Sequence, residues 1–417
     1  MYHINIPDCS EINVPLPTSK SITHRIYILA GLNKGKTTIT NALQAEDTSI
    51  TLKALVNMGI KACTTDQDFV CENAIGKVNE DKIYLGNSGS SARFLVPLGA
   101  LLDKPVYFYG EPRLHQRPFA ELFMALKKLS VHYQADKLLL PACIYPSEMQ
   151  GGTVRFENLP SSQIITALML AGLWMKNDLS LYLPQKTPSL PYINMTFQLM
   201  KRLGLECSYE DNCIWIKSHV PNYDWYYDVE KDLSAASYWV VFSLINDIKV
   251  ILPGISLPSL QGDERILQIA EEIGGKVMLY ANRVEISGSV NKGLSVDCSE
   301  IPDLVPALSV LALFAPQPFK MMNIKHLEYK ESNRIAAIQN NVAALGGKSE
   351  YSHGNLTIYP QKQYHGTRMK TYNDHRIAMS FAVAGTRIRD TIIENPACVN
   401  KSYPDFWQHF SFWKEIV

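Results

Sequence analysis

Short apolar runs, each preceded by a few small polar residues, recur along the whole chain. The polar starts lie at Ser21, Ser88, Ser161, Ser234, Asp303 and Asp374, so the intervals between them are 67, 73, 73, 69 and 71 residues. The runs, such as SITHRIYILAGL and DHRIAMSFAVAG, are apolar nearly all round, which is typical of helices buried in a bundle. The pattern therefore predicts six copies of a repeat of about 70 residues.

A second, amphipathic helix is predicted after each run, because apolar residues recur there every three and four positions. These helices cover residues 47–58, 118–129, 192–203, 263–273, 332–345 and 405–415. Runs rich in β-branched and aromatic residues predict strands at residues 106–109, 181–183, 249–252 and 356–359. We therefore expect an α/β protein with two closed domains of three repeats each, in which the N-terminal strand joins the C-terminal half.

Composition and charge narrow the classes of partner. The chain has 40 basic and 40 acidic residues, which argues against nucleic acid, because binding it needs a basic surface. The apolar runs are interrupted well before the ~20 residues that a membrane span needs. The opening residues, MYHINIPDCSEI, do not resemble a signal peptide, and the eight cysteines form no CxxC pair. We expect a cytoplasmic protein with reduced thiols and neither a membrane nor a nucleic-acid partner.

Cationic and hydroxylated residues gather at the starts of the predicted helices. At the first start, Lys20 precedes Ser21 and Arg25, which lie four residues apart on one helical face. Free backbone N–H groups at a helix start also attract anions. Taken alone, the stretch is also explained by a capped helix with two exposed cations.

Similar clusters recur at the same phase of the repeat. A glycine-flanked turn holds Asn87, Gly89 and Arg93, and a later loop holds Arg113 and Arg117. Arginine presents a planar fork that suits carboxylate and phosphate. The remaining clusters contain Ser161, Ser162, Gln163, Ser189, Tyr192, Asp303, Lys330, Glu331, Arg334, Asp374, Arg376 and Lys401.

Asp303 has two explanations. It precedes a very apolar run and so fits the N-cap of a buried helix. A partly buried carboxylate can instead act as a general base. If the helix starts converge between two domains, a cation-rich cleft with Asp303 and Glu331 inside it would suit phosphorylated or carboxylated substrates.

Ten motifs, in this order along the chain, resemble those of the EPSP synthases, the 3-phosphoshikimate 1-carboxyvinyltransferases. They are PTSKSITHR, LGNSGSSAR, GEPRLHQRP, SSQIITAL, SLPYI, QGD, IPD, KESNR, YNDHR and NKSYPDF. The resemblance implies two similar domains, each of three βαβαββ units around buried parallel helices, an inside-out α/β barrel with six repeats in all. The domains would comprise residues 19–230 and residues 1–18 with 231–417, with the active site in the cleft between them.

The resemblance also implies a reaction. The enolpyruvyl group of phosphoenolpyruvate would pass to the 5-hydroxyl of shikimate 3-phosphate through a tetrahedral adduct, with release of phosphate and with no metal or organic cofactor. This is a step of the shikimate pathway to chorismate and the aromatic amino acids. Asp303 would take the hydroxyl proton, and Glu331, helped by Lys20, would protonate the methylene carbon and later remove a proton from the methyl. We expect a monomer that is sensitive to the inhibitor glyphosate, because Gly89 leaves room for it.

The same motifs imply two sets of binding residues. Shikimate 3-phosphate would contact Lys20, Ser21, Arg25, Ser161, Ser162, Gln163, Ser189, Tyr192, Asp303, His326 and Lys330. Phosphoenolpyruvate would contact Lys20, Asn87, Gly89, Arg93, Arg117, Gln163, Arg334, Arg376 and Lys401. Two positions depart from the family pattern, since His326 stands where Asn is usual and Phe94 stands where Pro is frequent.

Two alternatives stay open. The UDP-N-acetylglucosamine 1-carboxyvinyltransferases share this fold and chemistry, but they typically carry a reactive cysteine in the loop before the Arg-Pro dipeptide. No cysteine occurs here between Cys71 and Cys143. The other alternative is a non-catalytic anion-binding protein of the same fold, which would have no need of Asp303, Glu331 and Lys20 together.

Overall fold

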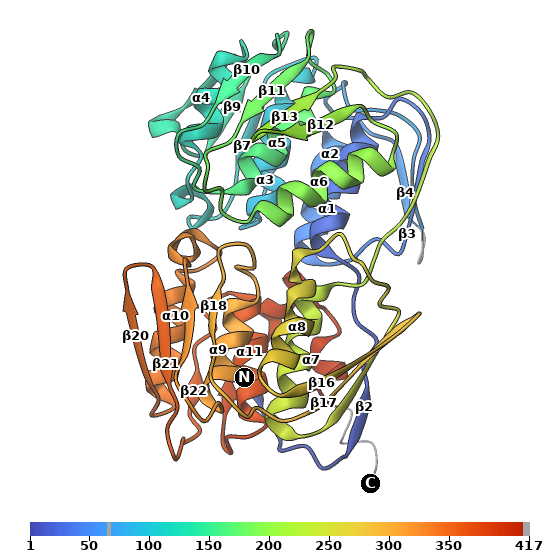
Figure 1. Cartoon of the computed structure of the whole chain (residues 1–417). Coiled ribbons are helices and arrows are strands. Elements are labelled where there is room, and N and C mark those ends of the chain that lie inside the picture. Colours follow the sequence, from blue (N-terminus) through green and yellow to red (C-terminus); the bar gives the residue numbers. More distant parts are fainter. Residues whose placement is uncertain (65–67, 412–417) are drawn as a thin grey trace. The chain divides into compact units, whose positions relative to one another are not determined.

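The computed structural model describes residues 1–64 and 68–411 and divides the chain into two compact units (Figure 1). The central unit is Thr18–Val229, and the terminal unit combines Met1–Pro17 with Glu230–Val417. The central unit begins and ends one residue earlier than the domain of residues 19–230 that the resemblance implies. The first strands of the chain thus belong to the unit that contains its C-terminal half.

The central unit contains three buried helices, each followed by a more exposed one. The buried helices are α1 (Lys20–Leu32), α3 (Gly89–Leu95) and α5 (Ser162–Gly172). The partly exposed helices are α2 (Glu46–Asn57), α4 (Ala120–Lys128) and α6 (Leu190–Arg202). The apolar runs of the sequence therefore form the interior, as their all-round hydrophobicity predicts.

Three four-stranded sheets cover these helices. Their strands, in sheet order, are β14 (Trp225–Asp228), β3 (Thr37–Thr40), β5 (Asp68–Cys71) and β4 (Ala62–Thr64); β6 (Lys82–Tyr84), β7 (Val106–Tyr109), β9 (Ala142–Ile144) and β8 (Tyr133–Ala135); and β10 (Gly152–Arg155), β11 (Leu179–Tyr182), β13 (Cys213–Ile216) and β12 (Cys207–Glu210). The first two strands of each sheet pair in parallel and the remaining neighbours are antiparallel.

The terminal unit repeats this plan. Its buried helices are α7 (Leu233–Asn246), α9 (Val305–Leu313) and α11 (His375–Gly385), which lie side by side in Figure 1. Its other helices are α8 (Arg265–Glu272), α10 (Arg334–Ala344) and α12 (Phe406–His409). The predicted helix 405–415 is therefore shorter where it is described, and its last four residues lie outside the described part of the chain.

Two sheets of the terminal unit each include a strand from the N-terminal end of the chain, β2 (Glu11–Asn13) in one and β1 (Tyr2–His3) in the other. The sheets of this unit consist of β16 (Gly275–Tyr280), β17 (Arg283–Gly288), β15 (Lys249–Pro253) and β2; β18 (Ser295–Asp297), β19 (Phe319–Met322), β21 (Asn355–Tyr359) and β20 (Lys348–Ser352); and β1, β23 (Ile392–Ile393) and β22 (Arg368–Met369). Parallel pairing of β2 with β15 places the N-terminal strand in this unit, as predicted.

A βαβαββ unit recurs in this order of elements. It is complete in β6–α3–β7–α4–β8–β9. Helix α3 connects β6 to β7, which pair in parallel, because parallel neighbours need a crossover connection. Helix α4 leads to β8, and β9 then pairs antiparallel with both β8 and β7. The predicted fold class, α/β with six repeats in two similar units, is confirmed. Its functional consequence is that the six buried helices begin at the polar clusters singled out in the sequence.

Candidate anion-binding site

The start of α1 holds a buried ion pair. Ser19 caps the helix, since its Oγ accepts from the backbone N–H of Ile22. Lys20, the first helical residue, donates from Nζ to Asp47 Oδ2 at 3.1 Å, and both side chains are at most one-tenth exposed. Lys20 is thus fixed at the helix start by a carboxylate that the sequence motifs did not single out.

Arg25 lies one turn further along α1 and is held by neutral groups. Its Nε donates to Thr196 Oγ1 at 2.7 Å, and its Nη groups donate to the carbonyl oxygens of Ser21 and Tyr192 at 2.8 and 2.9 Å. The guanidinium carbon also lies 5.3 Å from the ring centroid of Phe94. Burial lowers the pKa of Arg25 to about 10, which still leaves the side chain cationic at neutral pH.

The starts of α3 and α5 are joined through Gln163. Arg93 Nη1 donates to Gln163 Oε1 at 2.7 Å, and Gln163 Nε2 donates to Ser90 Oγ at 2.9 Å. Arg93 also donates to the carbonyl of Pro118 and lies 4.9 Å from the ring centroid of Phe119. Two residues on which the resemblance places the same ligand, Arg93 and Gln163, are therefore in direct contact.

Gly89 and Arg117 fit together closely. A Cβ placed on Gly89 would overlap the guanidinium of Arg117. Arg117 is buried, and its Nη1 lies 3.5 Å from the carbonyl oxygen of Asn87. The absence of a side chain at Gly89 thus lets a guanidinium lie directly against the first turn of α3.

Four further predicted residues lie at the starts of α5 and α6. Ser161 caps α5, with Oγ accepting from the backbone N–H of Gln163 at 3.3 Å. Ser162 is buried, and Ser189 precedes α6 in the left-handed conformation, with φ of 57°. Tyr192 contributes its backbone carbonyl to Arg25. Ser161 is therefore the N-cap of α5, whereas the Ser189 side chain makes no cap hydrogen bond to α6.

In the terminal unit, Arg334 at the start of α10 is the centre of a group of carboxylates. Its Nε, Nη1 and Nη2 donate to Asp374 at 2.9 Å, Asp303 at 2.8 Å and Glu331 at 2.7 Å. Arg376 Nη2 donates to the second oxygen of Asp303 at 2.8 Å. Two arginines and three carboxylates thus form one ion-pair network, which includes both predicted proton-transfer residues.

Asp303 is not an N-cap. Helix α9 begins at Val305 after Leu304, and no side chain caps it. The carboxylate instead bridges Arg334 and Arg376. Burial alone would raise the pKa of Asp303, but Arg376, Lys330 and Arg334 outweigh it and hold that pKa well below its usual value.

Two other predicted cations lie in this unit. Lys330 ends the 3-10 helix Lys325–Tyr329 and acts electrostatically on Asp303. Lys401 is buried at the end of the 3-10 helix Pro396–Lys401 and donates from Nζ to the carbonyl of Asn373 at 3.0 Å. Residue 373 directly precedes Asp374, so the loop before α11 connects Lys401 to the arginine network.

His326 lies in the 3-10 helix Lys325–Tyr329, just before Lys330, and is half-buried. Burial, followed by the charge of Lys330, lowers its pKa to about 3, so its ring is neutral. The backbone of Asn323 hydrogen-bonds the ring. Nε2 is buried and has no hydrogen-bond partner among the described residues.

Three acidic residues of these sites received no role from the sequence. Asp47 stands in the first turn of α2, where an acidic residue is ordinary. Asp374 was expected only as part of a polar helix start, and it does cap α11, but it also binds Arg334. Asp263 belongs to the QGD motif, is buried, and accepts a hydrogen bond from Ser234. Burial and the charge of Asp303 raise the pKa of Asp263 to about 7.

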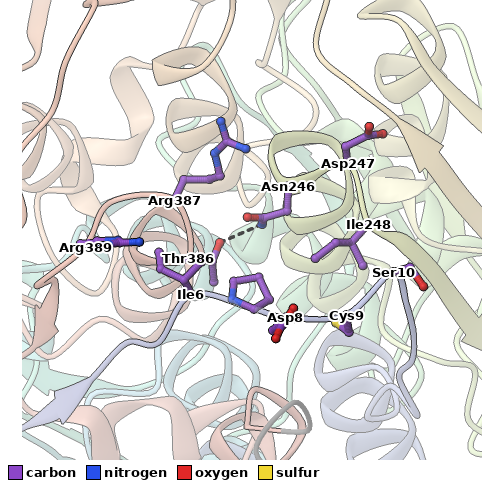
Figure 2. Close-up of a pocket in the computed structure, with 11 residues that line it drawn as sticks. Ile6, Asp8, Cys9, Ser10, Asn246, Asp247, Ile248, Thr386, Arg387 and Arg389 are labelled. Atoms are coloured by element: carbon purple, nitrogen blue, oxygen red, sulfur yellow. Dashed lines mark hydrogen bonds between the residues drawn. The ribbon is translucent and has the colours of Figure 1, made fainter.

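A separate pocket of about 720 Å³ lies at the other end of α7 and α11 (Figure 2). Asn246, the last residue of α7, donates to Thr386, which follows α11, at 2.8 Å. Residues 6–10 and the exposed Arg387 and Arg389 complete its wall. None of the predicted binding residues lines this pocket, since those on α11 lie at its N-terminal start.

No helix in the described part of the chain has the length and apolar character needed to cross a membrane. Within residues 1–64 and 68–411, no group of three or more His, Cys, Asp or Glu side chains is arranged to hold a metal ion.

The repeated βαβαββ plan and the buried cations at helix starts define an α/β protein suited to small anionic ligands. The family model of EPSP synthase (3-phosphoshikimate 1-carboxyvinyltransferase) matches residues 7–410. The chain belongs to this family.

Similar proteins extend over the same length. A curated 3-phosphoshikimate 1-carboxyvinyltransferase from Methanospirillum hungatei is 32% identical over 430 residues, covering 99% of each chain. The solved EPSP synthase from Acinetobacter baumannii shares the fold at a TM-score of 0.80, with 22% identity over 98% of this chain and 96% of that one. The enolpyruvyl transferase NikO from Streptomyces tendae shares it at 0.78, with 15% identity over 99% and 96%.

Proposed function

We propose that this protein transfers the enolpyruvyl group of phosphoenolpyruvate to the 5-hydroxyl of shikimate 3-phosphate and releases phosphate. Family membership supports the reaction class. The observation that carries the proposal is the pair of carboxylates, Asp303 and Glu331, held by the single guanidinium of Arg334. A base and an acid are thereby kept together among cations that suit phosphate and carboxylate groups.

The two substrates bind to different sets of residues. Both carry a phosphate and a carboxylate, so a fork of N–H donors suits either one. In the proposal, Arg334 and Arg376 bind the carboxylate of phosphoenolpyruvate. Its phosphate binds Lys20, Gly89, Arg117, Gln163 and Lys401, near Asn87 and Arg93. Shikimate 3-phosphate binds Lys20, Ser21, Arg25, Ser161, Ser162, Gln163, Ser189, Tyr192, Asp303, His326 and Lys330.

The proton transfers follow from the roles of three residues. Asp303 takes the proton of the 5-hydroxyl while the hydroxyl oxygen forms a bond to C2 of phosphoenolpyruvate. Glu331, assisted by Lys20, gives a proton to the methylene carbon, which produces the tetrahedral adduct. In the elimination, Glu331 takes back one methyl proton while the phosphate leaves with the proton that Asp303 had gained. The double bond is restored and both carboxylates return to their starting state, so protons and charge balance over the cycle.

His326 has a specific part in this proposal. Its ring is neutral, one side is held by the backbone of Asn323, and Nε2 is buried. A neutral ring whose other nitrogen donates to a carbonyl presents an acceptor at Nε2. His326 would therefore accept a hydrogen bond from a hydroxyl of shikimate 3-phosphate, in place of the carbonyl acceptor of the Asn that is usual there.

The proposal places the protein in the cytoplasm as a monomer. All eight cysteines are free thiols, which fits a reducing compartment. Cation-rich helix starts and the carboxylate pair supply binding and proton transfer, so the proposed steps use side chains of this chain alone.

Phosphate release by the purified protein tests the function. We expect release with phosphoenolpyruvate and shikimate 3-phosphate together, with formation of 5-enolpyruvylshikimate 3-phosphate, and none with either substrate alone. Release with UDP-N-acetylglucosamine in place of shikimate 3-phosphate would show that the related carboxyvinyltransferase activity is the correct one. Binding of both substrates without release would support a non-catalytic anion-binding protein.

A further inference from the structure

Arg334 is held by three carboxylates that differ in how firmly they are fixed. Asp374 is fully buried and accepts hydrogen bonds from Arg334 Nε, Ser332 Oγ and the backbone N–H of Arg376, at 2.9, 3.0 and 3.0 Å. Asp303 and Glu331 are 14% and 13% exposed. Asp374 is therefore part of the scaffold of α11, whereas the other two carboxylates lie toward solvent.

These two partly buried carboxylates, Asp303 and Glu331, occupy the N–H groups that a ligand carboxylate would use. Asp303 takes Arg334 Nη1 and Arg376 Nη2, each at 2.8 Å, and Glu331 takes Arg334 Nη2 at 2.7 Å. A guanidinium binds a carboxylate best through two parallel N–H groups in one plane. A substrate carboxylate therefore competes with Asp303 and Glu331 for the same donors.

We infer that Asp303 and Glu331 are internal counter-anions that the carboxylate of phosphoenolpyruvate displaces from Arg334 and Arg376, while Asp374 remains bound and positions Arg334. The inference rests on the proposed function and deepens it. The exchange swaps one ion pair for another and moves no proton. It also releases both carboxylates, so the arrival of one substrate makes the acid and the base available.

The charges around Asp303 agree with this exchange. Burial raises the pKa of Asp303, but Arg376, Lys330 and Arg334 outweigh it and lower that pKa, while Glu331 opposes these cations. A carboxylate bound by two arginines is a weak base. When a ligand carboxylate takes over those arginines, Asp303 loses stabilising contacts and becomes a better proton acceptor.

Two matched substitutions distinguish the carboxylate that is displaced, Asp303, from the carboxylate that positions Arg334, Asp374. Asp303→Asn and Asp374→Asn each remove one negative charge from Arg334 and keep the side-chain shape. Binding of phosphoenolpyruvate alone to the intact protein is measured by calorimetry, with inorganic phosphate as a probe that lacks the carboxylate. We expect Asp303→Asn to bind phosphoenolpyruvate about tenfold more tightly than the unmodified protein, with at most about a twofold change for inorganic phosphate. Asp374→Asn is expected to bind phosphoenolpyruvate about tenfold more weakly.

The inference is wrong if Asp303→Asn binds phosphoenolpyruvate no better than the unmodified protein, or if inorganic phosphate gains as much. An equal gain in Asp374→Asn would also overturn it, because any lost negative charge would then suffice. Should Asp374→Asn not fold, Ser332→Ala removes one donor to Asp374 and is expected to weaken binding about twofold to threefold. Phosphate release by the unmodified protein reports on the proposed function separately.

Discussion

Arg25, one turn into α1 of the central unit, and Arg334, at the start of α10 in the terminal unit, are both buried, but opposite kinds of group hold them. Arg25 rests on hydroxyl and carbonyl oxygens and on the ring of Phe94. Arg334 is surrounded by three carboxylates. Burial accordingly lowers the pKa of Arg25 to about 10, whereas for Arg334 the carboxylates outweigh burial and raise the pKa.

The difference indicates two ways of holding a cation for an anionic ligand. Neutral acceptors fix the direction of Arg25 and leave its charge for the ligand, which suits a phosphate that binds and leaves as a unit. Carboxylates compensate Arg334 until a ligand arrives, which suits a site where those carboxylates have chemistry to perform. The predictions below test this contrast.

The largest effect is expected from Lys20. Replacing Lys20 by Ala removes the proposed partner of Glu331 and should reduce kcat/KM by about 10³-fold or more. The change also leaves Asp47 buried without its cation, which should cost about 3 kcal/mol of unfolding free energy. The double variant Lys20→Ala with Asp47→Asn should recover most of that stability and none of the activity, as urea unfolding and phosphate release would show. Recovery of both would mean that Lys20 is only structural.

Asp263, in the terminal unit, leads to a prediction about how the free energy of unfolding depends on pH. Its folded pKa of about 7 lies above its ordinary value of 3.8, so the folded protein binds the extra proton. Its contribution to stability is full below about pH 4 and falls as pH rises to about 7. Asp263→Asn mimics the protonated form. The unfolding free energy of this variant minus that of the unmodified protein should therefore rise by about 1.4 kcal/mol per pH unit between pH 4 and 7 and stay constant above. Parallel pH curves would contradict this account of Asp263.

Gly89→Ala tests how closely Arg117 approaches the first turn of α3. The added Cβ would overlap the guanidinium, so Arg117 must move away from the proposed phosphate site. We expect KM for phosphoenolpyruvate to rise about tenfold and inhibition by glyphosate to weaken. Gly172→Ala in α5 is the control, because its Cβ would meet only apolar side chains, the nearest at 3.2 Å. An unchanged inhibition constant for Gly89→Ala would contradict this account of Gly89.

The smallest effect is expected from Phe94. Phe94→Leu removes the ring near Arg25, and a cation–π contact is worth about 0.5–2 kcal/mol. KM for shikimate 3-phosphate should rise about threefold, with kcat nearly unchanged. Phe94→Tyr keeps the ring and should restore KM if it folds as stably. A fall in kcat with constant KM would show that Phe94 acts elsewhere.

Local pattern was enough to predict the repeat and the starts of the buried helices, because both depend on short-range periodicity and capping. The polar partners of Arg25 were not predictable in this way. Thr196 lies 171 residues from Arg25 in the chain, and nothing in its apolar surroundings distinguishes it from a core threonine. For Asp303 the sequence allowed an N-cap or a general base, and the N-cap is wrong, because the partners of its carboxylate are two arginines 31 and 73 residues away.

Asp47 and Asp374 were missed for a related reason. An acidic residue in the first turn or at the cap of a helix is explained locally, so its sequence neighbours give no sign of a second role. Only the fold brings Asp47 to Lys20 and Asp374 to Arg334. The family motifs named the cations together with Asp303 and Glu331, and the structure added Asp47 and Asp374 as their ion-pair partners.

The most direct test of the contrast between the two arginines is a crystal structure of the protein with shikimate 3-phosphate and a non-reacting analogue of phosphoenolpyruvate. We expect the analogue's carboxylate on Arg334 and Arg376, with Asp303 and Glu331 beyond hydrogen-bond distance of Arg334 and Asp374 still bound. Arg25 should keep its contacts with Thr196, Ser21 and Tyr192. An Arg334 that still holds all three carboxylates while the analogue is bound would contradict the exchange.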